Sequence, residues 1–201
     1  MAPPAKTTDT NQTSSLGVYP GSFNPPTTGH LAIAEAAKRQ HGLARIDLTV
    51  STVALAKEEV VHPRFGHRIE VLRQAVAEID WLDVVVTEER LLAEQAQGYD
   101  VLIVGADKWH QIQDTVWYDN DPAARDVALA SLPTVAIAPR DGLATPTELT
   151  LDVSPELIEG ISSTAARDGG LQLMVPAART FAQQTGAWID IPRYDRWVSN
   201  S

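Results

Sequence analysis

The sequence contains no cysteine among its 201 residues, which excludes disulfide bonds, zinc–thiolate sites and a cysteine nucleophile. It also lacks an apolar run long enough to span a bilayer, and its first residues show no signal-peptide pattern. We therefore expect a cytoplasmic protein that does not enter a membrane.

Positive charge is scarce as well. The chain carries 16 Lys and Arg against 26 Asp and Glu, a net charge of −10. This balance argues against a nonspecific nucleic-acid binder, which needs a basic face. An anionic small-molecule substrate must then find a local positive site in an acidic protein.

Clustered metal ligands and internal repeats are also missing from the sequence. Four histidines form no recognisable ligand set, and surface or structural roles are expected for His41, His62, His67 and His110. No Asp or Glu cluster predicts a metal held by the protein. If Mg²⁺ takes part, we expect it to arrive on a nucleotide triphosphate, where it keeps several waters.

Apolar residues make up 44% of the chain and charged residues 21%, which is typical of a globular protein with one full core. Strand and helix patterns alternate along it, which predicts a single α/β, Rossmann-like domain with a parallel sheet flanked by helices. We place this domain at residues 15–190, after a disordered leader at 1–14 and before a tail at 191–201. We expect helices at 29–40, 63–79, 91–96, 122–132 and 175–184, and strands at 16–19, 46–50, 82–86, 100–104, 134–138 and 149–153. The apolar run at 82–86 predicts a strand buried on both faces.

The stretch from Gly17 to His30 is the most informative part of the chain. A short apolar strand is followed by a turn rich in Gly and Pro, and then by a run of helix-forming residues after Gly29. A strand that turns tightly into a helix presents free N–H groups and the positive end of the helix dipole, which together favour a phosphate. Thr27, Thr28 and His30 add side-chain donors at the same place.

Two motifs in the chain resemble a known family. Residues 21–25, Gly-Ser-Phe-Asn-Pro, followed by Thr27-x-Gly29-His30, resemble the signature of the adenylyl- and cytidylyltransferases. Residues 161–167, Ile-Ser-Ser-Thr-Ala-Ala-Arg, resemble an element of the branch that acts on nicotinamide or nicotinate mononucleotide. The resemblance extends from about Leu16 to Trp188 and is weak in the middle.

The resemblance assigns roles to residues of both motifs. It implies that His30 and Arg167 act in catalysis beside Lys57, and that the nucleotide is bound by Gly21, Ser22, Phe23, Thr27, Gly29, His30, Gly105, Asp107, Ser162, Ser163, Thr164 and Arg167. Simpler explanations stay open. His30 could only cap or pack its helix, and Ser162 could be an ordinary N-cap.

The acceptor side of the site is less defined by the sequence. The resemblance implies that Lys57 neutralises the phosphate of the acceptor, with Arg64 and Arg68 as weaker candidates; a solvated lysine beside Glu58 and Glu59 is the alternative. Gly105 and Asp107 resemble an element beside the adenosine, or else form a plain turn at the end of a strand. Trp109 or Trp117 could stack on a pyridine ring or could be core aromatics, and the spacing after Asp107 departs from the common pattern.

The resemblance thus implies an adenylyltransferase that moves AMP from ATP to nicotinate or nicotinamide mononucleotide, releasing pyrophosphate. The expected partners are ATP and a phosphorylated small-molecule acceptor, with no nucleic acid and no membrane, in a protein that could form a homo-oligomer. A phosphopantetheine adenylyltransferase, whose first motif is similar, or another small-molecule nucleotidyltransferase is the alternative enzyme. A catalytically silent nucleotide-binding regulator is the alternative outside enzymes.

Overall fold

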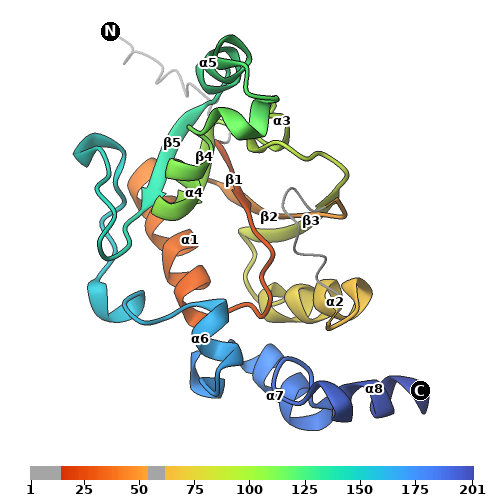
Figure 1. Ribbon diagram of the computed structural model, residues 1–201. Helices are drawn as coiled ribbons and strands as arrows, with labels where there is room; N and C mark the ends of the chain where they lie inside the picture. The colour runs from red at the N-terminus through yellow and green to blue at the C-terminus, as the bar shows by residue number, and fades with distance from the viewer. Residues whose placement is uncertain (1–14, 54–61) are drawn as a thin grey trace, which may run out of the picture.

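A computed structural model describes residues 15–53 and 62–201 of the chain. Within these residues a five-stranded parallel sheet has the order β3-β2-β1-β4-β5, and helices flank it (Figure 1). The strands are β1 (Leu16–Pro20), β2 (Arg45–Ser51), β3 (Leu82–Thr87), β4 (Val101–Gly105) and β5 (Thr134–Ala138). This architecture confirms the Rossmann-like fold predicted from the alternation of strands and helices.

Helices cover both faces of the sheet. The side chain of Tyr19 packs with α1 and α2, whereas its neighbour Val18 packs with α3 and α4 on the opposite face, as the two-residue period of a strand requires. The helices are α1 (Thr28–His41), α2 (Phe65–Val76), α3 (Leu92–Gln95), α4 (Ala106–Gln111), α5 (Pro122–Ala130), α6 (Ser163–Arg167), α7 (Pro176–Thr185) and α8 (Ile191–Ser199), with 3-10 turns η1 (Thr115–Tyr118), η2 (Thr147–Leu149), η3 (Pro155–Leu157) and η4 (Leu171–Leu173).

Two of the predicted strands need correction. Residues 149–153 do not form a strand: η2 ends at Leu149, and only an isolated bridge joins Thr150 to Ile137 of β5. The chain leaves the sheet edge after this bridge, since the N–H of Val153 bonds to Leu151 instead of to β5. The strand at 82–86 exists, but β3 lies at the other edge of the sheet, and Val86 is 38% exposed. An apolar run alone did not distinguish an edge strand from a central one.

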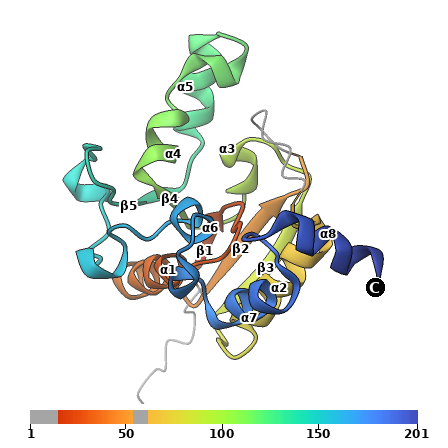
Figure 2. The same cartoon turned by 60° about the horizontal axis from the view of Figure 1, so that its bottom comes forward.

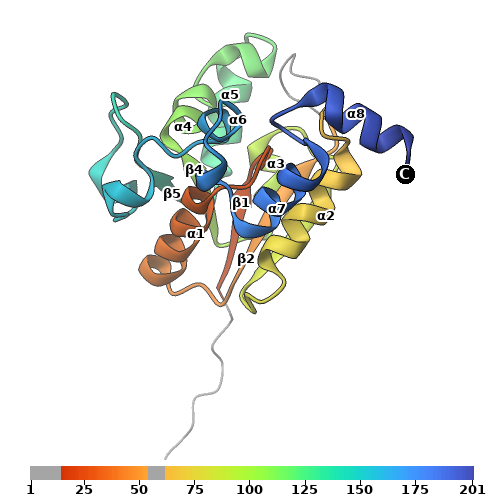
Figure 3. The ribbon, with the colours of Figure 1, turned by 90° about the horizontal axis from the view of Figure 1, so that it is seen from below.

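The C-terminal helices form a second apolar cluster against α2. Tyr194 of α8, which is 1% exposed, packs there with Trp188 and Ala178. In Figure 3, α7 lies beside α2, and α8 extends past the N-terminal end of α2 toward the C-terminus. Residues 191–201, expected to form a tail, therefore include a helix whose central tyrosine is buried.

The strand order reverses between β1 and β4, because β1 is followed by β2 on one side and paired with β4 on the other. The carboxyl ends of strands at such a switch point form the usual ligand crevice of an open parallel sheet. Figure 2 shows α6 beside β1 and α1, whereas α4 and α5 extend away from the sheet on the opposite side. Among the residues that the structure describes, no helix combines the length and the apolar character needed to cross a bilayer.

Candidate nucleotide site

The turn after β1 is built around Phe23. Its backbone has a φ of 42°, in the left-handed region that costs a non-glycine residue of the order of 1–3 kcal/mol, and its side chain is 2% exposed. A Cβ on Gly21 would come within 2.9 Å of the Phe23 ring. Glycine is therefore required at position 21 because the ring folds back over the turn, and burial of that ring holds the strained backbone in place.

His30 lies in the first turn of α1, which follows the N-cap residue Thr27. Its Nδ1 accepts the backbone N–H of Thr27 at 2.9 Å and lies 2.8 Å from the Thr27 hydroxyl. The ring also packs edge-on against Phe23, with 5.1 Å between the ring centroids. His30 thus caps its helix, as the simpler explanation held, but only through Nδ1.

The remaining ring nitrogen of His30 is a neutral donor. Because Nδ1 accepts a backbone N–H, the proton of the neutral ring resides on Nε2. Burial lowers the pKa of His30 from 6.5 to about 4. At neutral pH the side chain therefore offers an uncharged N–H group whose orientation is set by the cap.

The second motif is bonded directly to the first. Ser163 donates its hydroxyl to the carbonyl of Pro25 at 2.8 Å, and the Nη1 of Arg167 donates to the carbonyl of Asn24. Gly29 allows this approach, because a Cβ there would lie 3.0 Å from Ile161. Residues more than 130 positions apart in the sequence therefore meet at one turn.

Within the second motif, Ser162 is the N-cap of α6 and accepts the N–H of Ala165 at 3.0 Å. The Nη2 of Arg167 also contacts the hydroxyl of Thr164 at 3.2 Å. The helix has only five residues, so its dipole is weaker than that of α1, which has 14. The positive charge that α6 brings to the turn therefore comes mainly from the guanidinium of Arg167.

Gly105 and Asp107 lie at the carboxyl end of β4, where Asp107 belongs to the first turn of α4. A Cβ on Gly105 would lie 2.6 Å from the Asp107 carboxylate, so the side chain folds back over the strand end. Burial raises the pKa of Tyr19, and the negative charge of Asp107 raises it further. The rings of Tyr19 and His30 are 6.2 Å apart, so Tyr19 lies between the first motif and the strand end that carries Asp107.

Arg140 is a residue of this crevice that the sequence reasoning missed. It follows the carboxyl end of β5, and its Nη1 lies 3.8 Å from the Asp107 carboxylate, with both side chains 54% exposed. Its position two residues after a predicted strand was the available signal. An exposed pair of this kind contributes little to stability, which leaves the guanidinium free to reorient toward an anion.

The acceptor candidates are dispersed. Trp109 packs against the core cluster under α4, whereas Trp117 lies in η1 and lines a small pocket with Leu92, Lys108 and Tyr118. Lys57 lies outside the described residues, and its role stays a prediction. Within residues 15–53 and 62–201, no group of three or more His, Asp or Glu side chains is arranged to hold a metal ion.

The Cytidylyltransferase-like family matches residues 18–169, which is more than half of the chain. The chain belongs to this family. The match confirms the resemblance and starts in β1, so it includes the first motif, and it ends just after Arg167.

Individual relatives are distant. A probable nicotinate-nucleotide adenylyltransferase of Sulfurimonas denitrificans is 26% identical over 166 residues, 77% of this chain and 84% of that protein. A protein of the same description from Listeria welshimeri is 27% identical over 120 residues, 50% of this chain and 64% of the relative. A phosphopantetheine adenylyltransferase of Campylobacter concisus is 32% identical over 101 residues, 49% of this chain and 53% of the relative. The chain therefore spans less than two thirds of the length of some relatives that it matches.

Proposed function

We propose that this protein is a nucleotidyltransferase that moves AMP from ATP to nicotinate or nicotinamide mononucleotide, forming the dinucleotide and pyrophosphate. One observation carries the proposal: Ser163 and Arg167 of the second motif bond to the turn that leads into His30. The joined motifs lie at the switch point of a parallel sheet, and the family match together with relatives described as nicotinate-nucleotide adenylyltransferases supports the assignment.

In the proposed reaction, an oxygen of the acceptor phosphate attacks the α-phosphorus of ATP. A new P–O bond forms there, the bond to the bridging oxygen of the β-phosphate breaks, and its electron pair leaves on pyrophosphate. The protein needs no nucleophilic side chain for this step, because positioning and charge stabilisation supply the acceleration.

In this proposal, His30 and Arg167 each stabilise a different part of the negative charge in the transition state. The Nε2–H of His30 and the free N–H groups at the start of α1 donate to the α-phosphate, where charge builds up in the transition state. The guanidinium of Arg167 binds the β- and γ-phosphates that leave, because its planar fork can donate two parallel bonds. Mg²⁺ carried by the triphosphate would neutralise further charge.

A pyrophosphate-release assay tests the proposal. ATP is paired in turn with nicotinate mononucleotide, nicotinamide mononucleotide and phosphopantetheine, and the adenylylated product is identified by mass. Release with a pyridine mononucleotide alone supports the proposal. Release with phosphopantetheine alone would favour the second candidate, for which the Campylobacter relative is the specific observation. Binding of ATP without release from any acceptor would indicate a nucleotide-binding regulator.

Lys57 belongs to the acceptor side of the same proposal. If it neutralises the acceptor phosphate, Lys57→Ala should raise the KM for the acceptor and leave the KM for ATP nearly unchanged.

A further inference from the structure

Arg68, in the first turn of α2, is a buried cation with poor compensation. Its side chain belongs to a residue only 7% exposed, its Nη1 reaches the carbonyl of Ser22 at a long 3.4 Å, and its buried Nε has no hydrogen-bond partner. The guanidinium lies over the ring of Phe65, 5.4 Å from the ring centroid. Among the described residues, no carboxylate lies within the 4.0 Å of an ion pair with it.

Such an arrangement is unfavourable for the free protein. A buried charge costs several kcal/mol unless an opposite charge and well-placed hydrogen bonds compensate it. Burial accordingly lowers the pKa of Arg68, although an arginine stays protonated at neutral pH. A buried guanidinium that has no ion-pair partner among the described residues, and whose Nε has no hydrogen-bond partner, points to an anion that the fold is built to receive.

The position of Arg68 indicates which anion this is. Arg167 bonds to the carbonyl of Asn24, and Arg68 reaches the carbonyl of Ser22, two residues earlier in the same turn. The two guanidinium groups come from different elements, α6 and α2. An in-line displacement at phosphorus places the incoming and the leaving oxygens on opposite sides of the reacting atom, so two cations that reach different carbonyls of one turn suit the two anionic groups.

We propose that Arg68, together with the first turn of α2, binds the phosphate monoester of the acceptor. The N-terminus of this 12-residue helix adds the positive end of a dipole, and Arg64 adds a second guanidinium at the N-cap position. The identity of the anion as an acceptor phosphate rests on the proposed function, whereas the phosphate site itself does not.

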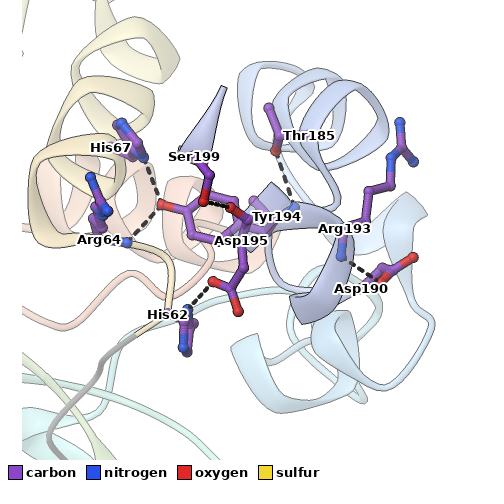
Figure 4. A network of polar contacts seen from close by, with 10 residues as sticks. His62, Arg64, His67, Thr185, Asp190, Arg193, Tyr194, Asp195 and Ser199 are labelled. Carbon is purple, nitrogen blue, oxygen red and sulfur yellow. Dashed lines mark hydrogen bonds and ion pairs between the residues drawn. The ribbon is translucent and has the colours of Figure 1, made fainter. Parts of the chain in front are cut away.

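The C-terminal helix holds this turn in place. The hydroxyl of Tyr194 accepts the backbone N–H of Arg64 at 2.9 Å and contacts the Nδ1 of His67 at 2.6 Å (Figure 4). His62, which precedes the same turn, lies 3.4 Å from Asp195. Because α8 bonds to the backbone of Arg64, four residues before Arg68, it holds the first turn of α2, which carries the guanidinium.

Thermal unfolding with inorganic phosphate as the probe tests the site. The protein is first saturated with α,β-methylene ATP, which fills the triphosphate site and cannot transfer AMP. Phosphate should then raise the unfolding temperature of the wild type further, because a ligand that binds the native state stabilises it. Arg68→Met should abolish this increment, while Arg73→Met, an exposed arginine of the same helix, should retain it.

The free Arg68→Met protein gives a second readout. The methionine removes the desolvation cost of the buried charge and loses only a long hydrogen bond to Ser22 and the contact over Phe65, so the unfolding temperature of the variant without ligand should equal or exceed that of the wild type. A lower unfolding temperature would assign the guanidinium a structural role and overturn the proposal. Phosphate stabilisation that is equal in wild type and Arg68→Met, or absent from both, would overturn it as well.

Kinetics connect the site to the acceptor. Arg68→Met should raise the KM for nicotinate mononucleotide by about tenfold or more, the scale for loss of a charge-assisted hydrogen bond, with the KM for ATP unchanged within about twofold. Nicotinate riboside, which lacks the phosphate, should bind wild type and variant equally. If no acceptor supports pyrophosphate release, the proposed function fails, but loss of phosphate stabilisation in Arg68→Met would still support the anion site.

Discussion

At the scale of single residues, His30 shows how one ring can serve both the fold and the site. Its Nδ1 completes the cap of α1 by accepting the N–H of Thr27, which leaves the Nε2–H as the group available to a ligand. Its edge-on contact with Phe23 adds a second constraint on the ring. A donor held in this way needs little reorganisation when charge develops nearby.

The first prediction concerns this donor. His30→Ala should lower kcat by about a hundredfold or more, the scale for one preorganised donor, with a much smaller effect on ATP binding. Steady-state kinetics and calorimetric titration with ATP measure the two quantities. His41→Ala, at the opposite end of the same helix, is the control. Near-normal turnover in His30→Ala would remove the residue from the mechanism.

The second prediction concerns pH. The folded pKa of His30, about 4, lies below its unfolded value of 6.5, so the unfolded state binds more protons between these two values. Stability is therefore fully present above pH 6.5 and falls as the pH drops, by up to about 3 kcal/mol near pH 4. His30→Gln should lack this contribution.

Urea unfolding of both proteins between pH 7 and pH 4.5 measures the effect. The free energy of unfolding of the wild type should fall relative to His30→Gln as the pH decreases. A difference between the two proteins that does not change with pH would show that the ring is not held neutral by the fold.

At the scale of elements, α6 is a short helix whose importance lies in what it contacts. Its five residues place Ser163 and Arg167 on the turn before α1, and Gly29 leaves the space for Ile161. The sequence identified both motifs, but their direct hydrogen bonding depends on how the chain returns after β5. That path runs through 3-10 turns and loops, whose sequences lack the periodic apolar pattern from which structure can be predicted.

The third prediction tests the fork of Arg167. Arg167→Lys keeps the positive charge but loses the planar geometry that binds two oxygens at once. One ammonium group cannot reproduce the planar fork that lets Arg167 bond to the Asn24 carbonyl and contact the triphosphate at once. ATP affinity, measured by calorimetry, should fall by about tenfold.

The control for this variant is Arg196→Lys, an exposed arginine in α8. It should bind ATP as the wild type does. Equal ATP affinity in Arg167→Lys and the wild type would mean that charge alone, or another residue, holds the leaving phosphates.

At the scale of the whole molecule, α8 links the C-terminal part of the chain to the first turn of α2. The hydroxyl of Tyr194 accepts the N–H of Arg64 and lies 2.6 Å from the Nδ1 of His67. Burial raises the pKa of Tyr194, which keeps this hydroxyl protonated. The link joins residues 130 positions apart, of which Arg64 lies within the family match and Tyr194 lies beyond it.

The fourth prediction tests this link. Tyr194→Phe leaves the Arg64 N–H and the His67 ring without their partner, which should cost about 1–3 kcal/mol of unfolding free energy. Chemical denaturation measures it, with Tyr118→Phe, whose hydroxyl donates to Ile112 in a distant part of the fold, as the comparison. If α8 positions Arg68, Tyr194→Phe should also raise the KM for the acceptor more than the KM for ATP. An unchanged denaturation midpoint would show that α8 is held by apolar packing alone.

The sequence by itself determined the elements and the chemistry of the two motifs. Local patterns predicted the five strands of the sheet, the phosphate-binding turn and the family, because strand alternation and the Gly-Pro turn depend on neighbouring residues. The resemblance also implied that both motifs bind one nucleotide, and only the tertiary structure decided which of their atoms meet. The contact between Arg167 and the turn at Asn24, the pairing of Arg140 with Asp107 and the burial of Arg68 depend on the strand order and on packing between distant segments. No local pattern encodes them, since burial and long-range contact are properties of the folded chain as a whole.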